Sequence, residues 1–159
     1  MEHTSPGGEP SPVRSYCGDR VLHHTLPVVE PGPRSAALER KRVQLPKGAL
    51  EVLHNNPDPI RFLAYLELKA GMDRGHHVHR LKEESFYLIS GHVTMGVEAL
   101  DTGESHQLDV QPGDLVQIFP GIAHAVRVHE AGHAVEFSRE PVGTDDTRPH
   151  TVPIPLRPS

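Results

Sequence analysis

The sequence has no tryptophan and only one cysteine, Cys17, among its 159 residues. A single cysteine cannot form a disulfide within the chain, so the sequence is not that of a small scaffold stabilised by disulfides. Aromatic residues make up only 4% of the chain. We therefore expect one modest, mostly aliphatic core, which a chain of this length is able to bury.

The chain also lacks long apolar runs and a strong charge of one sign. No window approaches the roughly 20 apolar residues of a membrane-spanning helix. Residues 1–16 show no basic start followed by an apolar run, as a secretory signal would. The net charge of −5 comes from interspersed acidic and basic residues, which leaves no basic surface for nucleic acid or an anionic membrane. We expect a cytoplasmic protein with neither nucleic acid nor membrane among its partners.

Proline, glycine and histidine are abundant, with 16, 14 and 13 residues. Apolar residues gather in short segments between Gly/Pro turns, and no segment longer than a turn or two has helical periodicity. This pattern predicts an all-β protein, either a sandwich or a barrel. The expected strands cover residues 21–26, 42–45, 49–54, 60–68, 86–89, 92–100, 105–110, 115–119, 123–128 and 134–138.

The composition divides the chain into three parts. Residues 1–18 are rich in Pro, Gly, Ser and charge, which predicts a flexible leader or an arm that docks on a neighbouring subunit. Residues 19–140 form the predicted β-barrel domain. Residues 141–159 are again rich in proline and predict an extended, partly disordered tail. We find no internal repeat and no linker that would separate two domains.

Two stretches of the barrel domain carry spaced motifs. Residues 71–91, GMDRGHHVHRLKEESFYLISG, fit the pattern G-x5-H-x-H-x4-E-x6-G. Residues 113–124, GDLVQIFPGIAH, form the second motif. His77 and His79 are two positions apart, so both point to the same face of a strand.

Together these stretches resemble the two signature motifs of the cupin superfamily. The first motif fits completely. In the second, Gly113, Gly121 and His124 match, whereas Phe119 stands at the family's proline and Val128 at its asparagine. The resemblance covers about residues 60–138. It implies a single cupin jelly-roll β-barrel (a double-stranded β-helix) of the small, single-domain, metal-binding, RmlC-like type.

The resemblance also implies a metal site. The implied ligands are His77, His79, Glu84 and His124, and the cofactor is one divalent transition metal per chain: Zn, Fe, Mn, Ni or Cu. Glu84 is preferred over Glu83 as the ligand because only Glu84 is separated from Gly91 by six residues, as the motif requires. His76 is out of phase with the two histidine ligands and is expected at the surface. Some sugar-nucleotide epimerases of the superfamily hold no metal and use a barrel histidine as a base, so this alternative stays open.

Three histidines and one carboxylate leave coordination positions open, as a catalytic site requires. The first motif and the tail residues Asp145–Thr147 also resemble cupins of sugar-nucleotide and polysaccharide pathways. We therefore expect an enzyme that isomerises or epimerises a small, oxygen-rich, sugar-like substrate. A metal-dependent dioxygenase and a non-catalytic small-molecule-binding cupin are the alternatives. We also expect a homodimer in which the leader extends a neighbour's sheet.

Overall fold

The computed structural model describes residues 13–141, 143 and 145–154, and strand is the main secondary structure among them. The strands are β1 (Val13–Tyr16), β2 (Val21–Thr25), β3 (Val28–Val29), β4 (Lys41–Val43), β5 (Leu50–Val52), β6 (Phe62–Leu68), β7 (Asp73–His79), β8 (Glu84–Ala99), β9 (Ser105–Val110), β10 (Asp114–Ile118), β11 (Ile122–Ser138) and β12 (Thr147–Pro149). The only helix in this part of the chain, α1 (Pro33–Ala36), is a single turn. No helix there is long and apolar enough to cross a membrane.

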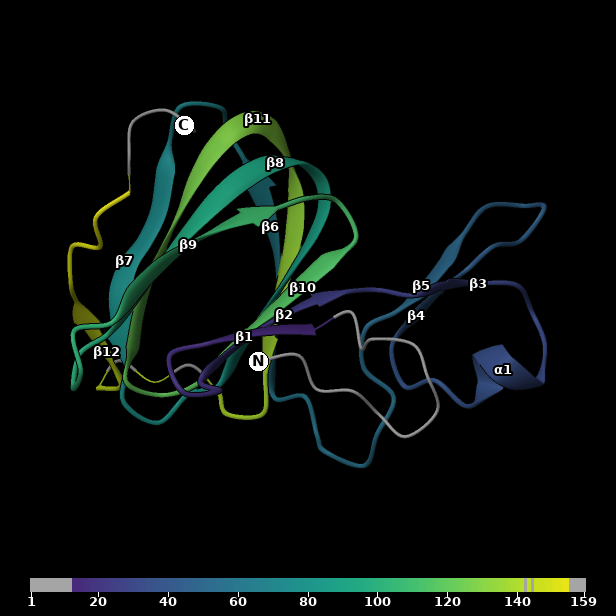
Figure 1. The fold of residues 1–159 in the computed structure, drawn as a ribbon, viewed down its shortest axis with the longest axis horizontal. Helices are drawn as coiled ribbons and strands as arrows, with labels where there is room; N and C mark the ends of the chain where they lie inside the picture. The colour runs from purple at the N-terminus through teal and green to yellow at the C-terminus, as the bar shows by residue number, and fades with distance from the viewer. Residues whose placement is uncertain (1–12, 142, 144, 155–159) are drawn as a thin grey trace.

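Two long strands, β8 and β11, connect the two sheets of the barrel (Figure 1). Residues 85–90 of β8 pair with residues 133–137 of β11, in a sheet that runs β6–β11–β8–β10–β2–β1. Residues 92–99 of β8 pair with residues 122–130 of β11, in a second sheet that runs β12–β7–β11–β8–β9. All pairings in both sheets are antiparallel. The predicted all-β jelly-roll architecture is confirmed.

Both long strands bend where they pass from one sheet to the other. The sequence predicts two separate strands divided by a turn at Ser90 and Gly91, but β8 continues through this point. Gly91 has φ +94°, and a Cβ there would lie 2.6 Å from the carbonyl oxygen of Glu130. A Cβ on Gly132 would lie 2.0 Å from the carbonyl oxygen of Ser90. Glycine is required here because the two backbones touch at the corner.

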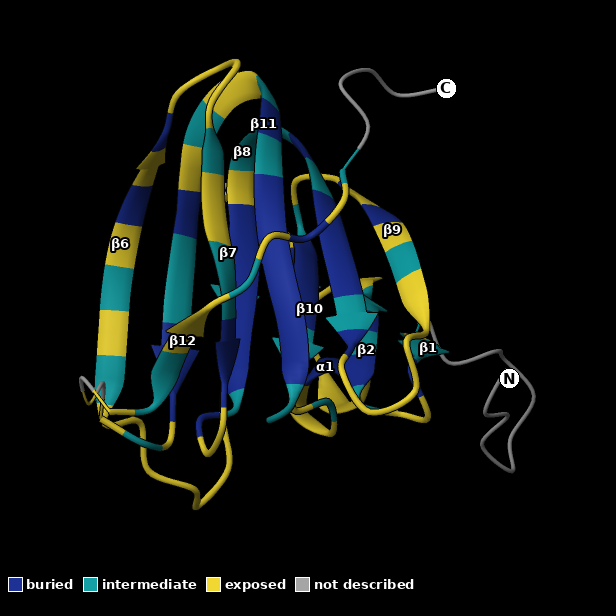
Figure 2. Cartoon of the chain, turned by 90° about the vertical axis from the view of Figure 1, so that its left-hand side faces the viewer, coloured by how far each residue is buried: buried dark blue, intermediate teal, exposed yellow. Residues whose placement is uncertain are grey.

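Aliphatic side chains from both sheets fill the barrel, as the low aromatic content predicts. The buried cluster includes Leu66, Leu68, Phe86, Leu88, Val93, Met95, Val97, Val126 and Val128. In Figure 2 the central strands are mostly dark blue, whereas the outer strands alternate between exposed and buried positions. This alternation is expected for sheets with one face on a core.

The ends of the described chain are more ordered than the composition predicts. The sheet begins inside the leader predicted over residues 1–18, because Val13–Tyr16 forms β1 and pairs with β2. Residues 1–12 lie outside the described residues. In the tail predicted over 141–159, Thr147–Pro149 forms β12 and pairs with β7. A small sheet, β3–β4–β5, lies with α1 to one side of the barrel (Figure 1).

Candidate metal centre

A β-bulge in β7 sets the direction in which the side chains of His77 and His79 point. The β7–β11 register shifts between His124 and Ala125, so that His77 lies opposite His124 and Gly75 lies opposite Ala125. His76, the extra residue, has φ +55°. Gly75 has φ +89°, and a Cβ on it would lie 2.9 Å from the carbonyl oxygen of His124. The bulge therefore lets β7 approach β11 closely at the level of the histidines.

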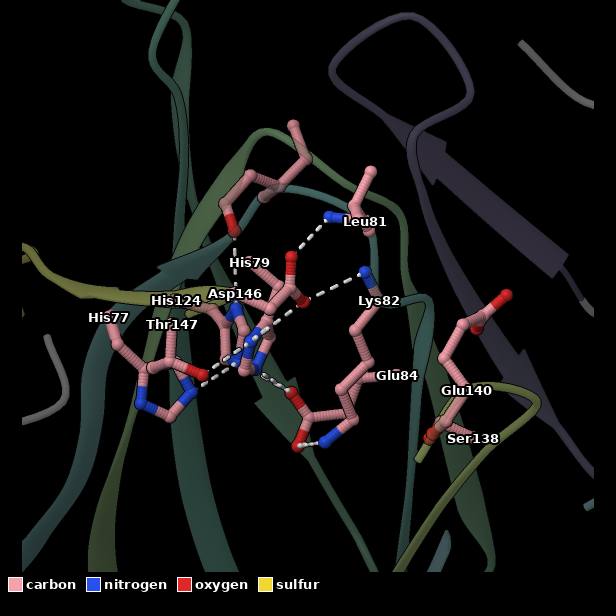
Figure 3. A network of polar contacts seen from close by, with 11 residues as sticks. His77, His79, Leu81, Lys82, Glu84, His124, Ser138, Glu140, Asp146 and Thr147 are labelled. Carbon is pink, nitrogen blue, oxygen red and sulfur yellow. Dashed lines mark hydrogen bonds and ion pairs between the residues drawn. The ribbon is translucent and has the colours of Figure 1, made fainter. Parts of the chain in front are cut away.

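The structure brings the four implied ligands together in one cluster (Figure 3). His124 Nε2 lies 2.8 Å from Glu84 Oε2, and His79 Nε2 lies 3.2 Å from the same oxygen. His77 Nε2 lies 3.2 Å from His124 Nε2. Two ligands held at right angles, each about 2.1 Å from one ion, are about 3 Å apart. The spacing of these atoms therefore fits a mononuclear metal site.

Hydrogen bonding at the cluster also fits an ion. His79 Nε2 and Glu84 Oε2 are buried, yet neither makes a hydrogen bond with acceptable geometry. Orphaned buried polar atoms are costly, and a cation between them would satisfy both. The Nδ1 atoms of two of the histidines have other partners: His124 Nδ1 donates to the carbonyl of Ile122 at 3.2 Å, and His79 Nδ1 contacts Thr147 Oγ1 at 3.1 Å. Such contacts orient an imidazole with Nε2 free for a metal.

Charge within the cluster is unevenly distributed. Burial, with His124 nearby, lowers the pKa of His77 to about 4, so its imidazole is neutral at pH 7. Burial raises the pKa of Glu84, but His124 and His79 outweigh it and hold that pKa well below its ordinary value. The pKa of His124 is raised because the attraction of Glu84 exceeds the effect of burial. Glu84 is therefore a charged carboxylate beside three imidazoles.

Residues of the tail reinforce the site from outside the barrel. The carboxylate of Asp146 accepts the backbone N–H groups of Leu81 and Lys82 at 2.7 and 3.1 Å, which fixes the turn between β7 and β8. Thr147 lies opposite His79 in the β12–β7 ladder. Lys82 is buried, with Nζ 3.9 Å from Glu84 Oε1. The sequence pointed to Asp146 and Thr147 only through a resemblance, and their contact with the site was not predicted.

A cavity of about 120 Å³ adjoins three of the ligands and reaches into the barrel. Besides the ligands, five apolar side chains line it: Leu66, Phe86, Met95, Ile118 and Val126. Two further charged residues line it, Arg74 and Glu136. Burial and the nearby Glu84 raise the pKa of Glu136 to about 8. Sequence reasoning missed Glu136, although strand alternation places it on the same face as the buried Ala134 and Ser138.

Two candidates set aside by the sequence lie outside the cluster. Glu83 pairs with Arg139 at 2.8 Å instead of facing the histidines. His76 also points away from the site, but it is not a plain surface residue. Its Nε2 lies 3.1 Å from Asp73 Oδ2, and its Nδ1 accepts the backbone N–H of Val152 at 3.1 Å. His76 therefore joins β7 to the tail.

Neither the family models nor the curated proteins include a match to this sequence. Solved structures do match. A sugar 3,4-ketoisomerase, QdtA from Thermoanaerobacterium thermosaccharolyticum, has a TM-score of 0.61 at 17% identity and covers 70% of this chain and 84% of its own. The dTDP-4-dehydrorhamnose 3,5-epimerase of Sulfolobus tokodaii has a TM-score of 0.65 at 12% identity, covering 86% of this chain and 81% of its own.

A third similar structure is RmlC from Legionella pneumophila, a dTDP-6-deoxy-D-glucose-3,5-epimerase. Its TM-score is 0.64 at 12% identity, and the match covers 85% of this chain and 74% of its own. These proteins define the class to which the fold belongs, the cupin jelly rolls. Within that class, the chain has the RmlC-like form of the barrel. The resemblance seen in the two motifs is thus confirmed at the level of the fold.

Proposed function

We propose that this protein is a metal-dependent isomerase or epimerase of a small, oxygen-rich, sugar-like substrate. One observation carries the proposal: a second carboxyl group, Glu136, lines the same cavity as the candidate ligands. A site that only stores a metal has no need of an adjoining cavity with its own polar groups. The solved structures with the same fold support this reaction class, since they are named as sugar ketoisomerases and epimerases.

The proposed cofactor is one divalent ion of Zn, Fe, Mn, Ni or Cu, held by His77, His79, Glu84 and His124. When bound, such an ion polarises a substrate carbonyl and acidifies the adjacent C–H group. Glu136 is placed to exchange a proton with that carbon or with a neighbouring hydroxyl. Arg74, which is exposed and lines the cavity, is placed to bind an anionic group of the substrate.

Three measurements test this proposal together. Elemental analysis of the purified protein should find about one divalent ion per chain. Proton NMR in D₂O should show deuterium entering a keto-sugar at carbons next to the carbonyl, with TDP-4-keto-6-deoxyglucose and free keto-hexoses as probes. An oxygen electrode should record no O₂ uptake with the same probes. Stoichiometric O₂ consumption would replace the proposal with a dioxygenase, and binding without exchange would replace it with a non-catalytic module.

Two further predictions from the sequence remain proposals. The first is a homodimer, which light scattering at micromolar concentrations checks directly. The second is a cytoplasmic location, which fractionation of the source cells checks. The activity proposed above depends on neither, because the four candidate ligands and Glu136 all belong to one chain.

A further inference from the structure

Strand β6 lies at an open edge of the first sheet. Its partner is β11, and no other strand in the described part of the chain pairs with it. Figure 2 places β6 at the outer border of the barrel. With 7 residues β6 is the longest edge strand, since β1, β9 and β12 have 4, 6 and 3. An edge strand presents unpaired N–H and C=O groups that can template pairing with another chain.

The outer face of β6 lacks most of the features that normally block such pairing. Leu63 and Tyr65 are 68% and 64% exposed. The strand contains no proline, and its register with β11 runs without a bulge from Phe62 to Leu68. The charges on this face lie at its two ends, where Arg61 and Glu67 are exposed. These two charges have opposite signs and lie at equal distances in sequence from Ala64.

We propose that β6 pairs antiparallel with β6 of a second copy of this chain, around a two-fold axis at Ala64. Directly opposite residues of an antiparallel pair share a face. In this register Arg61 faces Glu67 of the partner subunit, and Leu63 faces Tyr65 of the partner subunit. A register centred one residue later, on Tyr65, would place Arg61 opposite a lysine, Lys69 of the partner subunit. Charge complementarity therefore favours the register at Ala64 over the register at Tyr65.

The proposed interface differs from the leader exchange expected from the sequence, and it does not rest on the proposed enzymatic activity. It does border the candidate site. A groove of about 370 Å³ runs between the end of β6 and the start of β7, with Tyr65, Glu67 and Met72 among its lining residues. Leu66 and Arg74 line both this groove and the cavity beside the ligands. A second copy on β6 would thus form one wall of the approach to the cavity.

A charge-swap experiment tests the interface and its register. The full chain is studied by sedimentation equilibrium from about 1 to 100 μM as wild type, Arg61→Glu, Glu67→Arg and the double variant. The wild type should be a dimer. Each single variant places two like-charged pairs across the axis and should raise the dissociation constant at least about tenfold. The double variant restores both attractions, so its dissociation constant should return to within about threefold of the wild-type value.

Further variants separate this interface from other ways of forming a dimer. Leu63→Lys should dissociate the dimer, whereas Leu81→Lys, at a site with a similar 63% exposure, should not. Deleting residues 1–12 should leave the dimer intact. Because the replaced side chains are exposed, circular dichroism should show that every variant is folded. The proposal is overturned by a monomeric wild type, by single variants without rescue, or by a dimer that survives Leu63→Lys but is lost with residues 1–12.

Discussion

At the scale of single residues, the directions of the His77 and His79 side chains depend on the backbone of the two residues that precede His77. The bulge at Gly75 and His76 restores the register that sets His77 opposite His124. Without it, His77 and His79 would exchange faces with Val78, because side chains alternate along a strand. The spacing H-x-H is thus effective only together with the preceding glycine, which allows a left-handed conformation next to the His124 carbonyl.

Removal of any one candidate ligand should abolish stoichiometric metal binding. We expect alanine at His77, His79, Glu84 or His124 to weaken metal affinity by more than about 10–100-fold. That range is typical when a residue that hydrogen-bonds a metal ligand is lost. Elemental analysis after gel filtration measures the remaining ion per chain. Glu83→Ala is the matched control, because Glu83 adjoins a ligand but pairs with Arg139. Full metal in the four variants would refute the assignment.

Glu136→Gln should separate metal binding from turnover. The amide keeps the size of the side chain but removes a carboxyl group that can exchange protons, so we expect about one ion per chain and a turnover rate reduced by about 10²–10⁴-fold. Steady-state kinetics and elemental analysis of one preparation give both values. Glu140→Gln, in a nearby residue that does not line the cavity, is the control. Unchanged turnover would show that Glu136 takes no part in the reaction.

The spacing alone predicted that His77 and His79 share a strand face, and the resemblance of the two motifs to cupins predicted that Glu84 and His124 join them. Glu136 and Thr147 could not be found in this way. Their roles depend on which strands become neighbours: Glu136 lies opposite Phe86 and Thr147 lies opposite His79, residues 50 and 68 positions away in sequence. No local pattern specifies such long-range register.

At the scale of elements, β12 is the least expected part of the site. A segment with four prolines after residue 148 reads as irregular, yet the three residues of β12 pair with the ligand strand β7. Likewise, glycine at position 91 predicts a turn, whereas the chain uses it to bend one strand between two sheets. In both cases local propensity is overridden by pairing with a distant strand.

Thr147→Val should loosen the ligand His79. The substitution keeps the shape of the side chain but removes the hydroxyl that contacts His79 Nδ1 at 3.1 Å. We expect metal affinity to fall by about 10–100-fold, as for other losses of a partner that orients a ligand. Competition with a chelator measures the change. Arg148→Ala, in the next and exposed residue of β12, should have little effect, and equal losses in the two variants would contradict a specific role for the hydroxyl.

At the scale of the whole molecule, Arg127 joins two strands of the second sheet to each other and to the tail. Arg127 Nε and Nη2 each donate to the Asp73 carboxylate at 2.8 Å, and Nη1 donates to the Ile154 carbonyl at 2.6 Å. The hydrogen bond from Arg127 lowers the pKa of Asp73. Arg127 therefore pairs with Asp73 across strands β7 and β11 and also holds a segment beyond β12.

The stability that this pair provides should depend on pH. Because the folded pKa of Asp73 is depressed, its contribution is fully present above the unfolded pKa of about 3.9 and is lost as pH falls through the folded value. We expect Asp73→Asn to lower the free energy of unfolding by about 1 kcal/mol at pH 7 and by nearly nothing at pH 2. Urea unfolding followed by circular dichroism measures both. A loss that is the same at both pH values would point to packing instead of charge.

The position of β11 late in the sequence also determines when the barrel can fold during synthesis of the chain. Among the described residues, strands β6 and β7 pair with no strand that precedes them in the sequence. Both pair with β11, which is completed only at Ser138. Three of the four candidate ligands likewise leave the ribosome before His124. Closure of the barrel and assembly of the four candidate ligands are therefore one late folding event. Because this event depends on long-range contacts, we expect it to take milliseconds to seconds. Until then, the nascent chain carries two unpaired strands and an incomplete binding site.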